Sequence, residues 1–347
     1  MVDALASGAS EHYARGGSSP LIRTKQKAPI LWGFLLGLTT RGKNFLNKVS
    51  RCRVARTRTD ACIEHAAAEK GEARQSSHPH TIHETCYNTV MLHYVDEGSG
   101  PVIVALHGMA GSLRYWEALS ADLSKEHRLI RLDLLGFGHS PASKKGYRPV
   151  DHVRAIEETL QRLGVTEAFT LVGHSMGALI ALNYATTHPK RLQDLVLISM
   201  PIYSSAAQAR EDITKSKKRY RYAYYGRGSK LLCTVWCRWL RPISRNIAPL
   251  YLRNQPRHVA QDSVLHSWRA YSESMRDVIE QQQVTSDIQE LRVPARLVYG
   301  ASDSEIVLAN AKALRLNPRT TLTLLPGGHN IPLEHPQIIT HLILEQA

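Results

Sequence analysis

The stretch Phe169-Thr-Leu-Val-Gly-His-Ser-Met-Gly177, continued by Ala178-Leu-Ile-Ala-Leu-Asn-Tyr-Ala185, decides the fold. Its first four residues suit a short buried strand, and the residues after Gly177 suit a helix. A strand that turns at once into a helix forces the central residue, Ser175, into a strained backbone conformation, and the small residues two positions away on each side let strand and helix pass closely. The stretch therefore predicts a serine hydroxyl exposed where a strand of a parallel sheet ends.

The pattern Gly-x-Ser-x-Gly is a weak signal on its own, so the rest of the chain has to supply context. Apolar runs of strand length recur between stretches of helix length, which indicates an α/β fold with a mostly parallel sheet of about eight strands. Seven strands are evident at residues 88–95, 102–106, 129–132, 169–172, 195–199, 295–299 and 322–325. Helices are expected at residues 113–124, 150–163, 176–187, 307–314 and 333–344. The turn residues 96–100 predict that the first two strands form a hairpin.

The chain of 347 residues, 43% of them hydrophobic, divides into an extension, a core and an insertion. Residues 1–84 show no sustained periodicity and are expected to form a flexible basic extension with a short apolar segment at 29–38. Residues 85–200 and 294–347 carry the strands and are expected to form one core. Residues 201–293 have helical periodicity without a convincing buried strand, so they predict a helical insertion.

Two further residues follow strands and complete a nucleophilic site. A serine hydroxyl needs a base, and the base needs an acid that orients it. The run 295–299 leads into Gly300-Ala-Ser-Asp303, and the run 322–325 leads into Pro326-Gly-Gly-His329. Because parallel strands end at one edge of a sheet, we expect Ser175 as nucleophile, His329 as base and Asp303 as the orienting acid to lie together there, although Glu305 is a nearby rival for Asp303.

A tetrahedral oxyanion needs two backbone N–H donors. The residue after the nucleophile, Met176, is expected to supply one of them. The loop Leu106-His-Gly-Met109 follows an early strand, so the N–H of Met109 is the expected second donor.

With these motifs the chain resembles the α/β-hydrolase fold family over residues 85–347, specifically its single-domain serine hydrolases with a helical cap. The resemblance is carried by His107-Gly108, Asp133-Leu-Leu-Gly-Phe-Gly-His-Ser140, Gly173-His-Ser-Met-Gly177, Gly300-x-x-Asp303 and Gly328-His329. It implies that residues 201–293 are a cap over the active site, that His107, Gly108 and His174 lie at the substrate pocket, with His107 bracing the oxyanion loop, and that the enzyme uses water and no cofactor. Dehalogenases and epoxide hydrolases of this fold carry aspartate at the elbow, so Ser175 argues against both.

The formal net charge of +14 is concentrated in two segments. Residues 1–80 contain 13 basic and 6 acidic side chains, and residues 205–258 contain 13 and 2. The apolar segment 29–38 and the helical pattern around Trp239 suggest a peripheral membrane contact, with a solvated extension and packing against the core as the plainer alternatives. The basic and aromatic run 219–227 lacks an accompanying RNA-binding motif, so no nucleic acid partner is expected.

The five cysteines do not indicate a disulfide framework, because their number is odd and the chain is large enough to fold without one. A reducing, cytoplasmic location is expected. Cys233 and Cys237 lie one helical turn apart, but no matching Cys or His pair follows at zinc-ligand spacing, so no metal site is predicted.

The sequence thus predicts a serine hydrolase that cleaves a carboxylic ester, with an acyl or lipid-like small molecule as substrate. Two alternatives stay open. One is hydrolysis of a carbon–carbon bond in a diketone, which would use the same three residues. The other is a non-catalytic protein that keeps the fold and binds a ligand.

Overall fold

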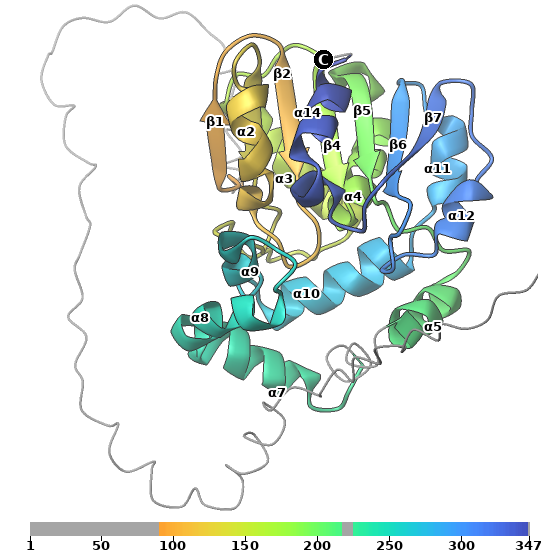
Figure 1. Cartoon of the computed structure of the whole chain (residues 1–347). Coiled ribbons are helices and arrows are strands. Elements are labelled where there is room, and N and C mark those ends of the chain that lie inside the picture. Colours follow the sequence, from red (N-terminus) through yellow and green to blue (C-terminus); the bar gives the residue numbers. More distant parts are fainter. Residues whose placement is uncertain (1–89, 217–224, 346–347) are drawn as a thin grey trace, which may run out of the picture. The chain divides into compact units, whose positions relative to one another are not determined.

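The computed structural model describes residues 90–216 and 225–345. The expected extension of residues 1–84, with its apolar segment 29–38, lies outside the described residues. So do Cys52, Cys62, Cys86 and most of the basic and aromatic run 219–227. The described part is an α/β fold in which helices lie on both faces of one sheet (Figure 1).

The sheet has seven strands in the order β1-β3-β2-β4-β5-β6-β7. Strands β2 to β7 are parallel, and β1 is antiparallel to its neighbour. The bounds are Tyr94–Glu97 (β1), Val102–Leu106 (β2), Arg128–Leu132 (β3), Phe169–His174 (β4), Leu192–Ile198 (β5), Ala295–Gly300 (β6) and Thr320–Leu325 (β7). Six of the seven expected strands lie where they are predicted, whereas the first, expected at residues 88–95, is observed at Tyr94–Glu97, so two residues of the expected turn belong to the strand. Within residues 90–216 and 225–345 no eighth strand joins the sheet.

The expected hairpin between the first two strands is wrong. Strand β1 pairs with β3, with Tyr94 opposite Leu132, and β2 lies on the other side of β3. The connection after β1 contains Gly98 and Gly100, both with positive φ. A Cβ on Gly98 would lie 2.3 Å from the carbonyl oxygen of His127, so this turn packs against the entry to β3 instead of closing a hairpin.

Each face of the sheet has its own hydrophobic core. One face is covered by α3, α4 and α11, and the other by α2, α13 and α14. The bounds of the helices outside the insertion are Leu113–Trp116 (η1), Glu117–Leu123 (α2), Pro149–Arg162 (α3), Met176–Thr187 (α4), Pro189–Arg191 (η2), Leu308–Lys312 (α12), Ile331–Glu334 (α13) and Pro336–Leu344 (α14). Helix α4 contributes an almost fully buried surface, because it packs directly behind β4 and β5.

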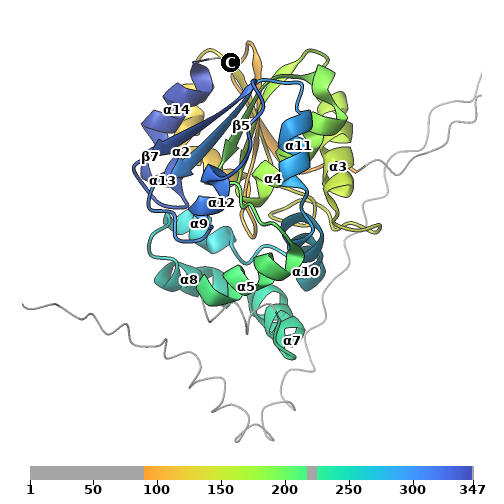
Figure 2. The ribbon, with the colours of Figure 1, turned by 90° about the vertical axis from the view of Figure 1, so that its right-hand side faces the viewer.

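The regular elements of the insertion between β5 and β6 are helices throughout its described residues. Its bounds are Ala206–Ser216 (α5), Ser229–Thr234 (α7), Val235–Trp239 (η3), Arg241–Tyr251 (α8), Arg257–Asp262 (α9), Trp268–Ser274 (α10), Met275–Glu280 (η4) and Val284–Glu290 (α11). Figures 1 and 2 show α5 and α7 to α10 together beyond the end of the sheet where the parallel strands finish. Helix α11, although within the interval 201–293, packs against α4 on the face of the sheet.

In residues 90–216 and 225–345 no helix is both long enough and apolar enough to cross a bilayer.

Candidate active site

The turn from β4 into α4 holds Ser175 in a strained conformation, with φ 54° and ψ −118°. A positive φ is uncommon for any residue with a Cβ and costs free energy that the surroundings must offset. The N–H of Ser175 donates to the carbonyl oxygen of Ile198 at 2.8 Å, which fixes the turn to the end of β5. The side chain is partly exposed, as the sequence predicts for this strand-to-helix turn.

The two glycines of the motif are needed for close approach. A Cβ on Gly173 would lie 2.5 Å from the carbonyl oxygen of Gly177, and a Cβ on Gly177 would lie 2.5 Å from that of His107. The absence of these side chains lets α4 begin directly against β4 and against the loop that follows β2.

The structure brings Ser175, His329 and Asp303 into one hydrogen-bonded chain. His329 Nε2 lies 3.1 Å from Ser175 Oγ, and His329 Nδ1 lies 2.9 Å from Asp303 Oδ2. An ionised carboxylate can only accept, so Nδ1 carries the imidazole proton and Nε2 presents its lone pair to the serine hydroxyl. This is the arrangement that a general base needs in order to take a proton from a nucleophile.

The Asp303 carboxylate is fully buried and held on both oxygens. Its Oδ1 accepts from the backbone N–H groups of Glu305 at 2.8 Å and of Ile306 at 3.3 Å. Burial alone would raise the pKa of Asp303, but the hydrogen bond from His329 and these backbone bonds outweigh it, so the pKa lies below its ordinary value. The carboxylate that contacts His329 is therefore that of Asp303, whereas its rival Glu305 contributes a backbone N–H to it, and the role of Asp303 as orienting acid stays a prediction.

The loops that carry Asp303 and His329 are tied to each other. The N–H of Ser302 donates to the carbonyl oxygen of Gly327 at 3.0 Å, and the hydroxyl of Ser302 donates to the same oxygen at 2.7 Å. The N–H of Gly328 donates to Glu334 Oε2 at 2.7 Å. Sequence reasoning did not single out Ser302. Glu334 lies in the segment Leu333-Glu-His-Pro336, which belongs to the motifs that resemble the family, but its bond to Gly328 was not expected.

His107 holds the loop after β2 from inside. Its Nδ1 lies 2.7 Å from the carbonyl oxygen of Gly108, and its Nε2 accepts from the N–H of Leu134 at 2.9 Å. Burial lowers the pKa of His107, and a neutral ring fits these two bonds. Both ring nitrogens are engaged with backbone, so the geometry favours the bracing role of His107, while its expected place at the substrate pocket stays a prediction.

The expected oxyanion donors flank the serine. Met176 is the first residue of α4, where a backbone N–H has no acceptor in a preceding turn. Gly108, directly before Met109, packs beside the nucleophile, since a Cβ there would lie 3.2 Å from the Cβ of Ser175. Met176 follows Ser175 in the chain, and Met109 follows a glycine that packs beside it; the role of both as donors stays a prediction.

His174 is a buried neighbour of the triad, and its expected contact with substrate stays a prediction. Its Nε2 donates to the carbonyl oxygen of His329 at 2.9 Å, and its ring stacks on Tyr115 with centroids 4.5 Å apart. Burial and the proximity of His329 lower the pKa of His174 to about 3, so the ring is neutral. Its hydrogen bond holds the backbone of His329, a contact that no sequence motif predicts.

Comparison with known proteins agrees with this architecture. The model of the α/β hydrolase fold family matches residues 101–336, which is more than half of the chain. The chain therefore belongs to the α/β-hydrolase fold family, as the motifs around Ser175 and His329 predict.

The individual proteins that the chain resembles share between 23% and 35% of the aligned residues with it. Over 284 residues the chain is 26% identical to the Bacillus subtilis (strain 168) protein named "Putative 2-succinyl-6-hydroxy-2,4-cyclohexadiene-1-carboxylate synthase", and the match covers 76% of this chain and 97% of that protein. It is 35% identical over 109 residues to the Arabidopsis thaliana protein named probable lysophospholipase BODYGUARD 4, which covers 30% of this chain and 26% of that protein. The solved structure of an esterase from Thermogutta terrifontis shares the fold, with a TM-score of 0.57, 23% identity, and coverage of 73% of this chain and 92% of that one.

Proposed function

We propose that this chain is a serine hydrolase that cleaves a carboxylic ester through an acyl-enzyme. The observation that carries the proposal is the chain of hydrogen bonds from Ser175 Oγ through His329 to the buried Asp303, built on a strained serine. Fold similarity alone would not support it, because one fold hosts many functions.

The geometry supports the following sequence of steps. Ser175 Oγ attacks the ester carbonyl carbon and passes its proton to His329 Nε2, while Asp303 stabilises the imidazolium through Nδ1–H. The N–H groups of Met109 and Met176 stabilise the oxyanion. Collapse of the intermediate expels the alcohol, which takes the proton from His329. Water, deprotonated by His329, then releases the acid and restores Ser175.

A second candidate is hydrolysis of a carbon–carbon bond in a diketone by the same three residues. The Bacillus subtilis relative, 97% of which is covered by the match, is named as a synthase and not as an esterase. That name supports a reaction other than ester cleavage as the second candidate. Release of p-nitrophenol from short acyl esters, with an initial burst equal to the enzyme concentration, favours the ester reaction.

The decisive experiment is active-site labelling with a fluorophosphonate, which reacts with an activated serine. The wild-type chain should be labelled once, at Ser175, and the Ser175→Ala variant should be neither labelled nor active. Ser286→Ala, which removes an exposed serine of the insertion, is the matched control and should behave as wild type. Labelling that persists in Ser175→Ala would contradict the proposal, and wild-type protein that is not labelled would favour the non-catalytic alternative.

We also propose that the insertion docks on an anionic membrane surface, which fits a lipid-like substrate. Seven of the eleven exposed large apolar side chains of the described residues lie on consecutive elements of the insertion, and we call them the α7–α8 surface. They are Leu231, Leu232, Trp239, Leu240, Ile243, Leu250 and Tyr251. Residues 225–257, which include this surface, contain seven basic side chains and no acidic one. Exposed apolar residues, a tryptophan and a positive charge together are typical of interfacial lipid binding.

A further inference from the structure

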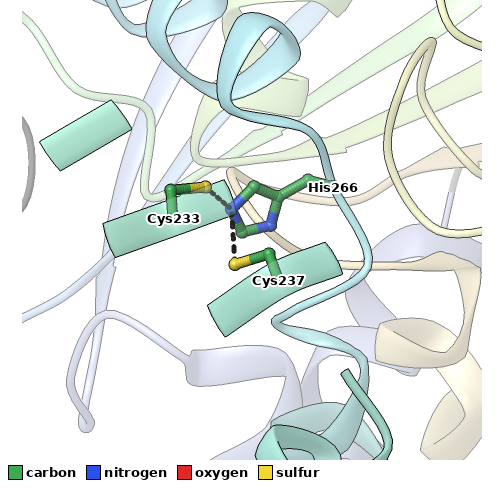
Figure 3. A group of neighbouring side chains, drawn as sticks. All are labelled: Cys233, Cys237 and His266. Atoms are coloured by element: carbon green, nitrogen blue, oxygen red, sulfur yellow. Dashed lines mark hydrogen bonds between the residues drawn. The ribbon is translucent and has the colours of Figure 1, made fainter. Parts of the chain in front are cut away.

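Two thiols and an imidazole from separate parts of the insertion converge at one point. Cys233 lies in α7, Cys237 follows it in the π-helical turn η3, and His266 comes from the segment between α9 and α10. Figure 3 shows both sulfur atoms directed at the same ring nitrogen of His266. The three potential ligand atoms all lie within 4.8 Å of one another.

Both sulfur–nitrogen distances in this cluster match an edge of a metal tetrahedron. Cys233 Sγ lies 3.7 Å and Cys237 Sγ lies 3.6 Å from His266 Nε2. In a tetrahedral zinc site, bond lengths of about 2.3 Å to sulfur and about 2.0 Å to nitrogen place a sulfur and a nitrogen about 3.6 Å apart. The two sulfur atoms lie within 4.8 Å of each other, so both are within reach of a common ion beside His266.

The cluster is also shielded, and its chemistry suits a borderline metal. Cys237 and His266 are buried, with exposed fractions of 6% and 9%, while Cys233 is partly exposed and offers a path of entry. Cysteine sulfur and imidazole nitrogen are ligands that Zn²⁺ prefers.

The ring of His266 is only partly satisfied by hydrogen bonds. Its other ring nitrogen, Nδ1, is buried and makes no hydrogen bond. A neutral imidazole carries its proton on Nδ1 or on Nε2. In either tautomer the Nδ1 of His266 lacks a hydrogen-bond partner. The backbone of His266 is held by an isolated bridge to Phe137, and its ring packs against the rings of Phe137 and Tyr271.

We propose that Cys233, Cys237 and His266 bind one Zn²⁺ ion, with water as the fourth ligand. Among residues 90–216 and 225–345 no further His, Cys, Asp or Glu belongs to this cluster, so no side chain of these types in that part of the chain fills the fourth position. Binding displaces the thiol protons to solvent and leaves two thiolates on the metal. The sequence alone argued against such a site because the third ligand lies 29 residues beyond Cys237 and has no second residue at zinc-ligand spacing.

This site is tied to the proposed active site without being part of it. The His266 ring lies 6.1 Å from that of Phe137, and Phe137 lies 6.2 Å from His107, which braces the loop of Met109. Zinc binding would fix the insertion against this end of the core, a structural role that does not depend on the hydrolase reaction.

The test uses the full chain, fully reduced and freed of metal by a chelator. Wild-type protein should take up about one equivalent of Zn²⁺, and Co²⁺ in its place should give the intense charge-transfer absorption of cobalt–thiolate bonds. Cys237→Ser and His266→Gln should each weaken uptake by more than about 100-fold, beyond the usual effect of losing an outer-shell partner. The matched control is the triple variant Cys52→Ser, Cys62→Ser, Cys86→Ser, which should bind as wild type.

A second measurement avoids variants that fail to fold. Zn²⁺ should slow alkylation of Cys233 and Cys237 in the wild-type chain, read at peptide level by mass spectrometry, and should leave Cys52, Cys62 and Cys86 unchanged. Loss of uptake in the triple variant, equal protection of all five cysteines, or no uptake by the wild-type chain would overturn the proposal.

Discussion

The Asp303 carboxylate determines which nitrogen of His329 carries the proton. Because its side chain has no exposed surface and its Oδ2 lies 2.9 Å from Nδ1, it selects the tautomer that leaves Nε2 free for Ser175. Removing its negative charge while keeping its shape should therefore affect the reaction far more than the fold.

Asp303→Asn should lower kcat for a p-nitrophenyl ester by about 10³- to 10⁴-fold, because the amide can hold the imidazole in the wrong tautomer and does not stabilise its cation. Steady-state kinetics measure this change, and circular dichroism checks the fold. Asp122→Asn, an exposed carboxylate on α2, serves as control and should retain wild-type rates. A loss of less than tenfold in Asp303→Asn would argue that this carboxylate does not act on His329.

The buried His174 gives the protein a predictable sensitivity to acid. Its pKa is about 3 when folded and about 6.5 in an unfolded chain, so between these values the unfolded state binds a proton that the folded state does not. Stability therefore falls as the pH drops from about 6.5 towards 3. Glutamine at this position still offers an N–H to the carbonyl oxygen of His329 and does not titrate.

His174→Gln should make the fall in unfolding free energy between pH 6 and pH 4 shallower by about 1.4 kcal/mol per pH unit. Urea denaturation at several pH values measures the slope for both proteins. His341→Gln, whose side chain is 80% exposed, should leave the slope unchanged. Parallel slopes for wild type and His174→Gln would show that His174 is not held neutral by burial.

At the scale of elements, the insertion differs from the sheet in what it exposes. The helices that cover the sheet bury their apolar sides, whereas Trp239 and Leu231 on the α7–α8 surface are 69% and 66% exposed. The helical periodicity around Trp239 predicts a helix but does not say whether its apolar side meets the core, and packing against the core is the favoured interpretation over membrane contact. In the structure these two side chains remain exposed, and the plainer alternative of packing against the core does not account for them.

Replacing Leu231 and Trp239 together by serine should weaken binding to vesicles that contain anionic lipid by about tenfold or more, since each buried apolar side chain contributes about 1.5 to 3 kcal/mol to lipid insertion. Sedimentation with vesicles measures the partition, and higher salt should weaken the wild-type interaction. Ile338→Ser, an exposed apolar residue on α14, is the control and should bind as wild type. Unchanged binding of the double variant, or binding only to neutral vesicles, would contradict docking through this surface.

Prediction from sequence succeeded where local pattern and chain order suffice. Strands β2 to β7 follow from apolar runs, and Ser175, Asp303 and His329 follow from the rule that residues after parallel strands share one edge. The pairing of β1 with β3 did not follow, because the turn at Gly98 and Gly100 is set by contact with the backbone before β3. The order of residue types along a short segment does not predict contacts of this kind, which join segments that are distant in the sequence.

The insertion shows the same limit more clearly. Nothing in the sequence near Cys233 points to His266, and nothing near Ser112 points to Asp262, yet both pairs meet in the structure. Such contacts depend on how several short helices pack against one another and on the core. Residue type alone therefore predicted neither the thiol–imidazole cluster nor the way the insertion is attached.

At the scale of the whole molecule, the buried carboxylate of Asp262 joins the insertion to the core. Asp262 is the last residue of α9, and its Oδ2 accepts a hydrogen bond from the Ser112 hydroxyl at 2.9 Å. Ser112 follows the loop that contains Met109. Its Oδ1 accepts from Arg245 of α8 at 3.2 Å, and Arg114 of the core lies 3.5 Å from Oδ2. One side chain thus connects two helices of the insertion to the start of η1.

Asp262→Ala should destabilise the protein by about 1 to 3 kcal/mol, because the Ser112 hydroxyl loses its buried acceptor and two arginines lose their shared partner. The same change should speed proteolysis within the insertion before the core is cleaved, since the attachment of α9 is weakened. If the insertion covers the substrate, KM should rise more than kcat falls. Asp277→Ala, which removes a carboxylate of the same insertion that pairs with the adjacent Arg276, should change neither stability nor cleavage. Equal proteolysis of the Asp262→Ala and Asp277→Ala variants would mean that the insertion is held to the core by packing of its apolar side chains and not by this carboxylate.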